Sequence, residues 1–397
     1  MNREIIISQK KIVYFLFVIL IFSSKISAQI SPSGYVEVTE WIDHTPINDK
    51  QVDGIVYIKK ANKFYVLEEV KKGQPLNIVS FGVKPDGRTD SSLPLQKAID
   101  FAVKTGWSIE MPIGTIVTSK KILVDLSMAK TDRKIKIKGA GRNLTIIHNI
   151  GSETDIALHV KGNMQQVNYF NIEGFSIKRT DVGKPDGGTA LKLENLLNVT
   201  VKDIDTFRFI TGFEFTDVCA GYFENLVATW GDYGLINKKT TKGFTYPNLL
   251  NYVNCSFLAN AIRGAYIEYG HNVKFDSCGF EGNYGTGLEM SYNGLNGSVS
   301  ANVINCYFEN NINNADVILT VGNGGSVNFI GNTFNRFDNK TENNIIINVT
   351  SDKKAKLNMI GNGFMDAGKF TPSNDRSSIK IIGKKQNLDV DDRNYYK

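Results

Sequence analysis

The sequence has few residues with redox or metal-binding chemistry. Its 397 residues include four histidines and four cysteines, at Cys219, Cys255, Cys278 and Cys306. None of these cysteines forms the CxxC spacing that is typical of zinc sites. We therefore expect no metal site built from them.

The sequence also has little excess charge and only one long hydrophobic run. A formal net charge of +6 permits an acidic ligand, but it gives no basic stripe of the kind that nucleic-acid-binding proteins carry. This run, Ile12–Phe22, is too short for a comfortable transmembrane helix, and no second apolar stretch of spanning length follows. We therefore expect neither a nucleic-acid partner nor stable membrane insertion.

Residues 1–28 are predicted to be a secretory signal peptide. Lys10 and Lys11 form its basic end, Ile12–Phe22 its apolar core, and Ser27 and Ala28 its small-residue cleavage site. An uncleaved anchor is the alternative. Removal of this segment lowers the net charge from +6 to +3. The mature protein is expected in the periplasm, at the cell surface or outside the cell.

A short pattern recurs along the rest of the chain. Each copy is an alternating apolar run, then a small or polar residue, then phenylalanine, as in Asn272–Phe280. Self-similarity with a period of about 20–50 residues indicates stacked repeats. Other copies end at Phe175, Phe207, Phe257, Phe308, Phe334 and Phe364.

A second column of apolar-x-apolar triplets has the same period. Because strands alternate faces, the outer residues of each triplet are expected to point inward and the middle one outward. Two strand-like segments per repeat predict an all-β solenoid, a parallel β-helix over residues 76–385 with a polar tail at 386–397. The triplets are Leu158–Val160, Leu191–Leu193, Phe213–Phe215, Ala265–Ile267, Leu288–Met290, Val317–Leu319, Ile345–Ile347 and Ile379–Ile381, with a weaker copy from Leu235.

Three cysteines take part in the repeat. Cys255, Cys278 and Cys306 occupy equivalent positions, where the next two copies have Asn332 and Asn362. We predict an internal ladder of buried, reduced thiols, because free cysteine is among the most buried residue types. A strained disulfide between rungs about 4.8 Å apart is the alternative.

Residues 29–75 precede the repeats. Asp53–Ile58 and Phe64–Leu67, joined through Lys59–Lys63, predict a β-hairpin. The segment is interpreted as a small cap or as a site for attachment or oligomerisation. The string Trp41–His44 resembles one in calcium-dependent pectate lyases, but it lies before the first repeat and is interpreted as a coincidence.

Residues 78–118 carry a family resemblance. The motif Phe81–Asp90, a helix containing Leu95–Asp100, and Met111–Thr115 resemble the start of the pectate lyase superfamily, in particular the rhamnogalacturonase and epimerase-like pectate lyase domain. Ser91 replaces the second aspartate of the family pattern. The resemblance implies a single-stranded right-handed β-helix that binds sugar chains in a groove.

The same motif predicts a short N-terminal capping helix. Leu95, Ala98, Ile99, Ala102 and Val103 recur at helical spacing on one face and would cover the open end of the solenoid. Asp86 and Asp90 are expected to order the glycine-rich turn.

The catalytic signatures of the relatives are missing. The polygalacturonase series N-T-D, D-D, G-H-G and R-I-K on successive rungs does not occur, nor does the D-P-H string of alginate epimerases. Function has to be argued from outward-facing residues, because a fold does not fix a function.

The richest outward-facing segment lies around residues 263–292. Catalysis by β-elimination would use Arg263 to neutralise a uronate carboxylate and His271, Tyr266 or Lys274 as the base. Hydrolysis would use Glu268 and Glu289, whose backbones are expected about 8 Å apart, one rung and two strand positions away. Calcium is left open as a cofactor. The candidate catalytic residues are Arg263, Tyr266, Glu268, His271 and Glu289, and the candidate substrate-binding residues are Lys192, Glu214, Trp230, Tyr233, Tyr269, Tyr284 and Tyr292.

The sequence therefore indicates an exported carbohydrate-active protein, a polysaccharide lyase or glycoside hydrolase that acts on an acidic, pectin-like polysaccharide. A non-catalytic carbohydrate-binding or surface structural β-helix is the alternative.

Overall fold

The computed structural model falls into two compact units, residues 1–75 and 76–397. The predicted signal peptide, residues 1–28, lies outside the described residues. Those residues are 32–41, 44–128, 134–151, 156–163, 169–179, 187–240, 247–291, 299–312, 314–322, 325–335, 343–350, 352–365 and 378–395.

The first unit contains a small antiparallel sheet with strand order β1-β3-β2. The predicted hairpin is confirmed, and Ala61 and Asn62 at its tip have φ of 48° and 60°, as a tight hairpin turn requires. Trp41 stacks on Tyr57 with ring centroids 4.1 Å apart, so the tryptophan of the lyase-like string has a structural role. The elements are β1 (Tyr35–Val38), η1 (Asp49–Gln51), β2 (Tyr57–Lys60), β3 (Lys63–Leu67) and α2 (Glu68–Lys71).

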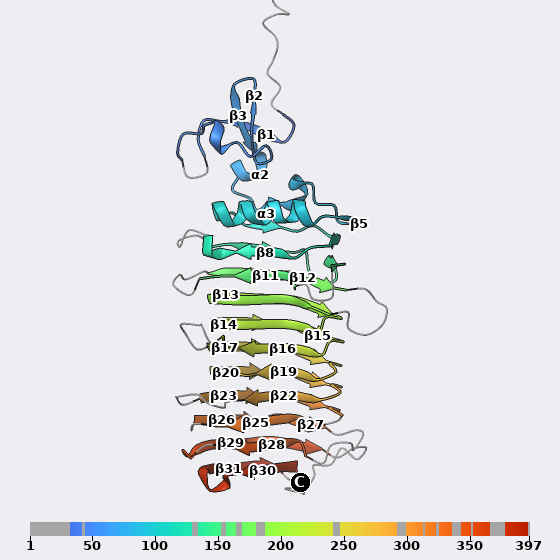
Figure 1. Ribbon diagram of the computed structural model, residues 1–397, viewed down its shortest axis with the longest axis vertical. Helices are drawn as coiled ribbons and strands as arrows, with labels where there is room; N and C mark the ends of the chain where they lie inside the picture. The colour runs from blue at the N-terminus through green and yellow to red at the C-terminus, as the bar shows by residue number, and fades with distance from the viewer. Residues whose placement is uncertain are drawn as a thin grey trace, which may run out of the picture. The chain divides into compact units, whose positions relative to one another are not determined.

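The second unit is a parallel β-helix (Figure 1). Its strands stack in three columns, which we call faces A, B and C in the order in which the chain visits them within each rung from residue 122 onwards. Face A consists of β8 (Ile122–Asp125), β11 (Ile156–Lys161), the first parts of β13 (Thr189–Phe207) and β14 (Thr211–Glu224), β16 (Tyr233–Lys238), β19 (Arg263–Ile267), β22 (Thr286–Ser291), β25 (Val317–Val321), β28 (Ile345–Val349) and β30 (Ile379–Gly383).

Faces B and C complete each rung. Face B consists of β4 (Leu76–Asn77), β6 (Ile109–Glu110), β9 (Lys136–Lys138), the first part of β12 (Phe170–Lys178), later parts of β13 and β14, β17 (Asn248–Val253), β20 (His271–Asp276), β23 (Val299–Ile304), β26 (Gly325–Ile330), the first part of β29 (Ala355–Met365) and β31 (Leu388–Tyr395). Face C consists of β5 (Asp86–Asp90), β7 (Gly114–Thr118), β10 (Thr145–Asn149), the ends of β12 and β13, β15 (Val227–Thr229), β18 (Ser256–Leu258), β21 (Gly279–Glu281), β24 (Tyr307–Glu309), β27 (Thr333–Asn335) and the end of β29.

The expectation of two strands per repeat was wrong, because the phenylalanine-containing segment bends into two strands. The bend is made by one residue in the left-handed region, a conformation that Gly and Asn reach more easily than most residues. In the repeat Asn272–Phe280 this residue is Ser277, with φ of 57°. It is the small or polar residue of the sequence pattern. The equivalent residues are Gly174, Asp203, Asn225, Asn254, Asn305, Gly331 and Gly361.

The predicted triplet column is confirmed in register. On face A, Lys192 pairs with Glu214, Ile236 with Tyr266, and Tyr266 with Glu289. The flanking residues, such as Ala265 and Ile267, are fully buried. The weak copy at Leu235 is therefore a regular rung, whose outward residue is Ile236.

Aromatic rings stack along the interior from rung to rung. Phe280, Phe308, Phe334 and Phe364 form a continuous pile with successive centroids 4.8–4.9 Å apart. Each such pair contributes about 0.5–1.5 kcal/mol beyond the area that it buries. The recurrent phenylalanine of the sequence pattern thus ties neighbouring rungs together.

The predicted internal ladder is confirmed. Cys255, Cys278 and Cys306 are buried free thiols, and Sγ of Cys278 lies 3.5 Å from the carbonyl oxygen of Tyr252, to which it donates. Asn332 continues the column, and its Nδ2 donates to Oδ1 of Asn362 at 2.8 Å. Buried polar groups in this column are therefore satisfied between rungs, as burial requires.

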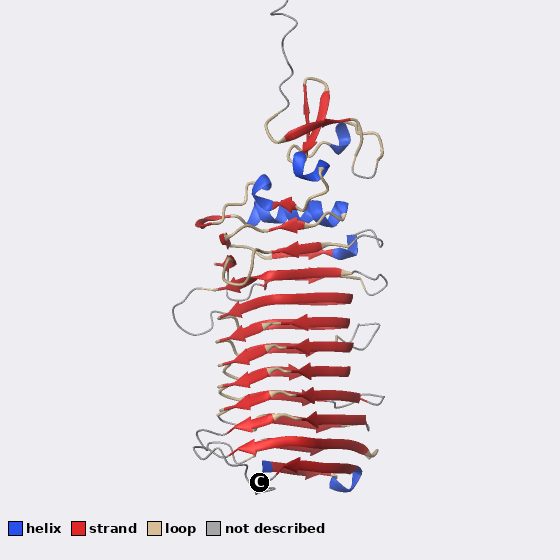
Figure 2. Cartoon of the chain, turned by 180° about the vertical axis from the view of Figure 1, so that it is seen from behind, coloured by secondary structure: helices blue, strands red, loops and turns tan. Residues whose placement is uncertain are grey.

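The predicted capping helix is α3 (Ser92–Thr105), which lies across the N-terminal end of the stack (Figure 2). All five residues predicted for its inner face are buried. Asp86 and Asp90 order the preceding turn as expected, since Asp86 accepts from Thr89 and Asp90 from Ser92 and Ser119. The described part of this unit also contains the short 3-10 helices η2 (Ile78–Phe81), η3 (Leu126–Met128) and η5 (Lys385–Asn387).

The β-helix continues past the predicted end at residue 385. Residues 386–397 were expected to form a polar tail, but β31 pairs in parallel with β29 from Leu388 to Arg393. Its sequence is rich in charge because it belongs to the last rung, where more of the strand is exposed.

Candidate functional site

Face A carries a continuous line of outward side chains across its middle rungs. In register order they are His159, Lys192, Glu214, Ile236, Tyr266 and Glu289. All except Ile236 are middle residues of apolar-x-apolar triplets, and Ile236 belongs to the weaker copy that starts at Leu235. The sequence therefore predicted both their alignment and their outward direction, although His159 is buried by its neighbours.

The earlier rungs of this line form an ion-pair network. Nζ of Lys192 lies 3.2 Å from Glu214 and 3.3 Å from Glu194. Nζ of Lys238 lies 3.1 Å from Oε1 of Glu214, the oxygen that Lys192 also contacts. Burial opposes ionisation of Glu214, but Lys192 and Lys238 outweigh it and lower the pKa of this carboxyl. Lys192 and Glu214, predicted to bind substrate, are thus already paired with each other.

The histidine of this network is neutral at pH 7. Burial lowers the pKa of His159 below its ordinary value of 6.5, and Glu194 offsets this only in part. Nε2 of His159 lies 3.2 Å from Oε2 of Glu194. A neutral, buried imidazole in this position holds the carboxylate in place.

The later rungs of the line gather around Arg263. Its Nε donates to Oε2 of Glu289 at 2.5 Å, and its Nη1 lies 3.4 Å from the Tyr233 hydroxyl. The guanidinium carbon lies 4.9 Å from the centre of the Tyr266 ring. Burial raises the pKa of Tyr266, and Glu268 and Glu289 add to the effect. We call Tyr233, Arg263, Tyr266 and Glu289 the Arg263 cluster.

Glu268 lies beside this cluster with the predicted offset from Glu289. Tyr266 pairs with Glu289, and Glu268 is two residues further along the same chain segment. The backbone N–H of Glu268 donates to the carbonyl of Asn237, so the residue keeps its place in the stack. One rung and two strand positions correspond to a backbone separation of about 8 Å.

Exposed apolar side chains border the Arg263 cluster. They lie on the turns that lead from face C to face A, and Trp230 and Tyr284 are 53% and 50% exposed. Ile262, on the turn between those of Trp230 and Tyr284, and Ile210, on the turn of the preceding rung, are also exposed. Exposed aromatic rings beside polar groups give a surface that suits the apolar faces of sugar rings.

Other predicted site residues lie elsewhere or outside the described residues. His271 begins β20 on face B, where it pairs with Asn248, and Lys274 on the same strand is bound to Asp276 at 2.7 Å. Tyr269 lies in the turn between faces A and B, where its carbonyl accepts from Asn237. The chain turns to another face between Arg263 and these two residues, so the arginine and the predicted bases lie on different faces. Tyr292 lies outside the described residues.

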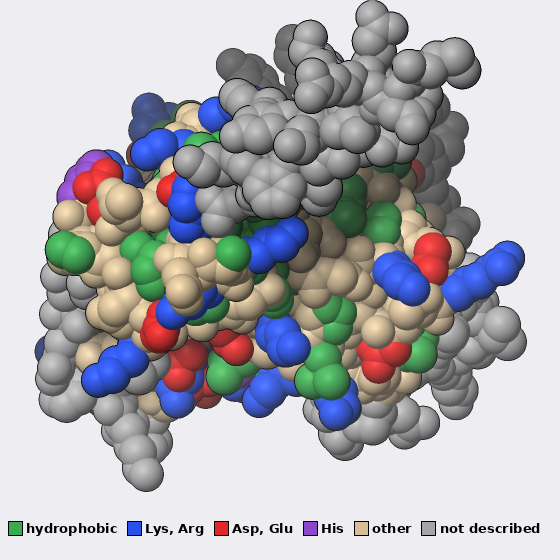
Figure 3. Space-filling model, turned by 90° about the horizontal axis from the view of Figure 1, so that it is seen from above, with side chains coloured by type: hydrophobic (Ala, Val, Ile, Leu, Met, Phe, Trp, Pro, Cys, Tyr) green, Lys and Arg blue, Asp and Glu red, His purple; other side chains and the backbone are tan. Residues whose placement is uncertain are grey.

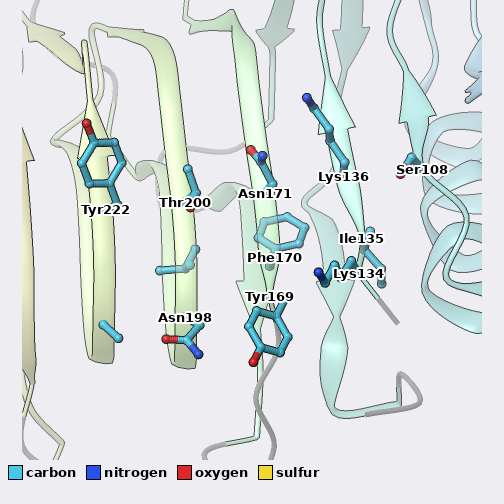
Figure 4. Close-up of a pocket in the computed structure, with 12 residues that line it drawn as sticks. Ser108, Lys134, Ile135, Lys136, Tyr169, Phe170, Asn171, Asn198, Thr200 and Tyr222 are labelled. Carbon is cyan, nitrogen blue, oxygen red and sulfur yellow. The ribbon is translucent and has the colours of Figure 1, made fainter. Parts of the chain in front are cut away.

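A cleft of about 480 Å³ opens on face B, where no site was predicted from the sequence. It is lined by side chains of β9, β12, β13 and β14 and of the turns that precede these strands, including Lys134, Tyr169, Asn198 and Tyr222 (Figure 4). A period-two reading of the phenylalanine-containing segments would have found the outward residues Asn171, Thr200 and Tyr222. The predicted sites came from the outward positions of the triplets and their flanking turns, which lie on face A.

On the side of the molecule shown in Figure 3, Lys and Arg side chains lie among Asp and Glu side chains.

Within the described ranges, no three His, Cys, Asp or Glu side chains come together as a metal site would require. The helices found in those ranges include none that is both long and apolar enough to cross a membrane.

The family comparison agrees with the fold. Residues 76–256 match the family described as rhamnogalacturonase A/epimerase, pectate lyase-like. The matched residues make up a little under half of the chain. The match begins with β4 and covers the capping helix and the first rungs, so the predicted resemblance is confirmed. No curated protein sequence matches the chain.

Solved structures of phage tailspikes share this fold. The enzymatically active domain of tailspike protein 2 from bacteriophage CBA120 is 11% identical, with a TM-score of 0.62 over 91% of this chain and 55% of that one. Tailspike protein gp49 of Acinetobacter baumannii bacteriophage Fri1, a capsular polysaccharide depolymerase, is 15% identical, with a TM-score of 0.51 over 91% of this chain and 65% of that one. This chain thus spans a little over half of the first tailspike domain. At such identities the likeness shows the fold alone.

Proposed function

We propose that this protein binds a polysaccharide across the middle rungs of face A and hydrolyses it there. The observation that carries the proposal is the Arg263 cluster, in which a cation, two tyrosine rings and a carboxylate meet on an outward face bordered by Trp230 and Tyr284. The family of the first rungs and the polysaccharide depolymerase among the structural neighbours support it. An acidic, pectin-like chain is the substrate class that the family implies.

The geometry favours hydrolysis over β-elimination. Elimination needs a cation free to neutralise a uronate and a base beside it, whereas Arg263 is already bound to Glu289. Tyr266 has a raised pKa and therefore keeps its proton at neutral pH. The other bases considered, His271 and Lys274, lie on face B.

Glu268 and Glu289 suit the two roles of an inverting hydrolase. Such enzymes hold an acid and a base about 6.5–9.5 Å apart with the sugar and a water between them. Nε of Arg263 donates to Oε2 of Glu289 and so holds this carboxylate in one orientation, which suits the positioning of a general base. Glu268 then donates the proton to the leaving oxygen, and Glu289 takes one from the attacking water.

A binding function without catalysis is the second candidate. One observation favours it: Arg263 holds the carboxylate that would act as base, and the Glu289 side chain is only 17% exposed. In that case Trp230, Tyr284 and the cluster would bind a sugar chain that other proteins cleave.

The test is a screen of purified residues 29–397 on pectic, alginate and host-type acidic polysaccharides, with and without calcium. New reducing ends without ultraviolet absorbance from unsaturated products are expected. Unsaturated products would show that the enzyme acts by elimination, and would contradict hydrolysis. Binding to a polysaccharide without any product, in the folded protein, would establish the second candidate.

Export is also proposed, on the strength of residues 1–28 alone. Expression of the full chain in a bacterial host with a secretory pathway should give a mature protein that begins at Gln29. A product that retains Met1 in the cytoplasm would contradict the proposal.

A further inference from the structure

The cleft on face B is built from outward residues of four consecutive rungs. Lys136, Asn171, Thr200 and Tyr222 pair in register on β9, β12, β13 and β14, so their side chains form one row across the strands. In Figure 4, Tyr222 and Lys136 lie on opposite sides of the strands that carry Thr200 and Asn171. Tyr169 and Asn198 form the edge of the cleft, on the turn from face A.

The edge residues have an unusual backbone conformation. Tyr169 and Asn198 have φ of 44° and 60°, in the left-handed region. Tyrosine adopts this region at a cost that asparagine largely avoids. The turn directs Tyr169 outward, where it is 51% exposed. Tyr222 is 37% exposed, so two aromatic rings flank a row of amide and hydroxyl groups.

The cleft carries positive charge without a lining carboxylate. Its lining includes Lys134 and Lys136 and no Asp or Glu. Nζ of Lys136 is neutralised by Glu173 at 2.7 Å. Nζ of Lys134 lies 5.5 Å from the centre of the Tyr169 ring, and within the described ranges no carboxylate forms an ion pair with it. Lys134 is therefore available to an anion that approaches the Tyr169 ring.

One polar atom in the row lacks a partner. Oδ1 of Asn171 is buried and accepts no hydrogen bond from the described residues. A buried acceptor left unsatisfied costs about 1–3 kcal/mol, so rotation of this amide towards a ligand hydroxyl in the cleft would gain a hydrogen bond. The amide of Asn198 and the hydroxyl of Thr200 offer further hydrogen bonds beside it.

We propose that the cleft on face B is a second carbohydrate site, which binds an anionic oligosaccharide. The rings of Tyr169 and Tyr222 contact sugar faces, Asn171 accepts from a hydroxyl, and Lys134 pairs with a carboxylate or sulfate. The proposal does not rest on hydrolysis at face A, because it concerns other residues on another face. A site of this kind would hold a polymer while face A acts on a different part of it.

The test is calorimetric titration of purified residues 29–397 with three trisaccharides: a galacturonic acid trimer, a sulfated trimer and an uncharged trimer. The two anionic arms distinguish a carboxylate from a sulfate as the bound group. We expect at least one anionic trimer to bind more tightly than the uncharged one. Lys134→Gln should weaken the anionic trimer on the order of fivefold and leave the uncharged trimer unchanged. Tyr222→Ala should weaken every trimer that binds, by about tenfold.

Two control variants separate the two faces. Lys356→Gln makes the same charge change at an exposed position of face B, far along the stack on β29, and should leave binding unchanged. Tyr284→Ala alters only face A, and should not change the binding component that Lys134→Gln removes. Loss of hydrolysis with this component intact would count against the proposed function alone.

Three results of the trimer titrations would overturn the second site. They are the absence of binding by both anionic trimers, equal affinity of wild type and Lys134→Gln for them, and a loss in Tyr284→Ala as large as that in Tyr222→Ala. Tighter binding of a single-stranded oligonucleotide than of any trimer would also overturn it, by making the cleft a nucleic-acid site.

Discussion

Arg263 on β19 and Glu289 on β22 are joined across one rung by a hydrogen bond of 2.5 Å from Nε to Oε2. The same guanidinium lies between the rings of Tyr233 and Tyr266, at 5.7 and 4.9 Å from their centres. This arrangement fixes the carboxylate that we propose as general base.

Substitutions of Arg263 should therefore show whether activity depends on its positive charge alone or also on the shape of its guanidinium group. Lysine keeps the charge but lacks the planar group that stacks on tyrosine rings while it donates through Nε. We expect Arg263→Lys to lower kcat/KM by at least about tenfold, and Arg263→Ala by about a hundredfold. Steady-state kinetics on the active polysaccharide would measure this. Full activity in Arg263→Lys would show that only charge matters here.

The stacked interior predicts where the solenoid is most sensitive. Phe308 is fully buried between Phe280 and Phe334, with centroids 4.9 and 4.8 Å away. Phe308→Ala should reduce the free energy of unfolding by about 3–5 kcal/mol. Tyr284→Ala, which removes a half-exposed ring, should change the free energy of unfolding by less than about 0.5 kcal/mol. Urea denaturation followed by circular dichroism would compare them, and equal losses would contradict the stacking account.

The cysteine ladder predicts slow thiol chemistry. Cys278 is 1% exposed, and its thiol donates hydrogen bonds to backbone carbonyls of its own rung and of the preceding rung. A thiol reagent should leave it unmodified in the native protein and label it rapidly in denaturant. Mass spectrometry of the labelled peptide would follow the reaction, and fast native labelling would show that the rung opens.

The carboxylates of the capping turn should make the free energy of unfolding depend on pH in the acidic range. Burial raises the pKa of Asp90, but hydrogen bonds from Ser119 and Ser92 outweigh it and lower the pKa from 3.8 to about 2. A carboxyl whose pKa is lower in the folded state stabilises above the unfolded value, and this contribution disappears as pH falls from about 4 towards 2.

Asp90→Asn should therefore destabilise the protein at pH 7 and lose most of this effect near pH 2. Urea titrations of both proteins at several pH values would show it. A difference in unfolding free energy that does not change with pH would contradict the assigned role of Asp90.

Much of the fold could be predicted from the sequence because each rung repeats the same physical requirement. The interior needs an apolar residue at alternate positions, so the pattern of the triplet Ala265–Ile267 is by itself enough to identify Tyr266 as outward. The third strand was missed, although the bend at Ser277 leaves a signal: the spacing of buried residues changes from two to three between Phe275 and Cys278.

The candidate site could be predicted from the sequence less completely than the fold. Period-two alternation correctly placed Tyr266 and Glu289 on one face, but it does not show how a turn reorients the chain. His271 follows Glu268 by three residues, yet it begins a strand on another face. The face B cleft depends on Lys134, Tyr169 and Tyr222 from different rungs, and no single segment of sequence displays that combination.

The central claim is hydrolysis by Glu268 and Glu289 on face A. It is tested most directly by the initial rate of reducing-end release from the active polysaccharide by wild type, Glu268→Gln and Glu289→Gln, with Glu281→Gln on face C as the matched control. We predict losses of about 10²–10⁴ in both site variants, unchanged thermal unfolding, and wild-type activity in the control. Wild-type rates in Glu268→Gln and Glu289→Gln would contradict it.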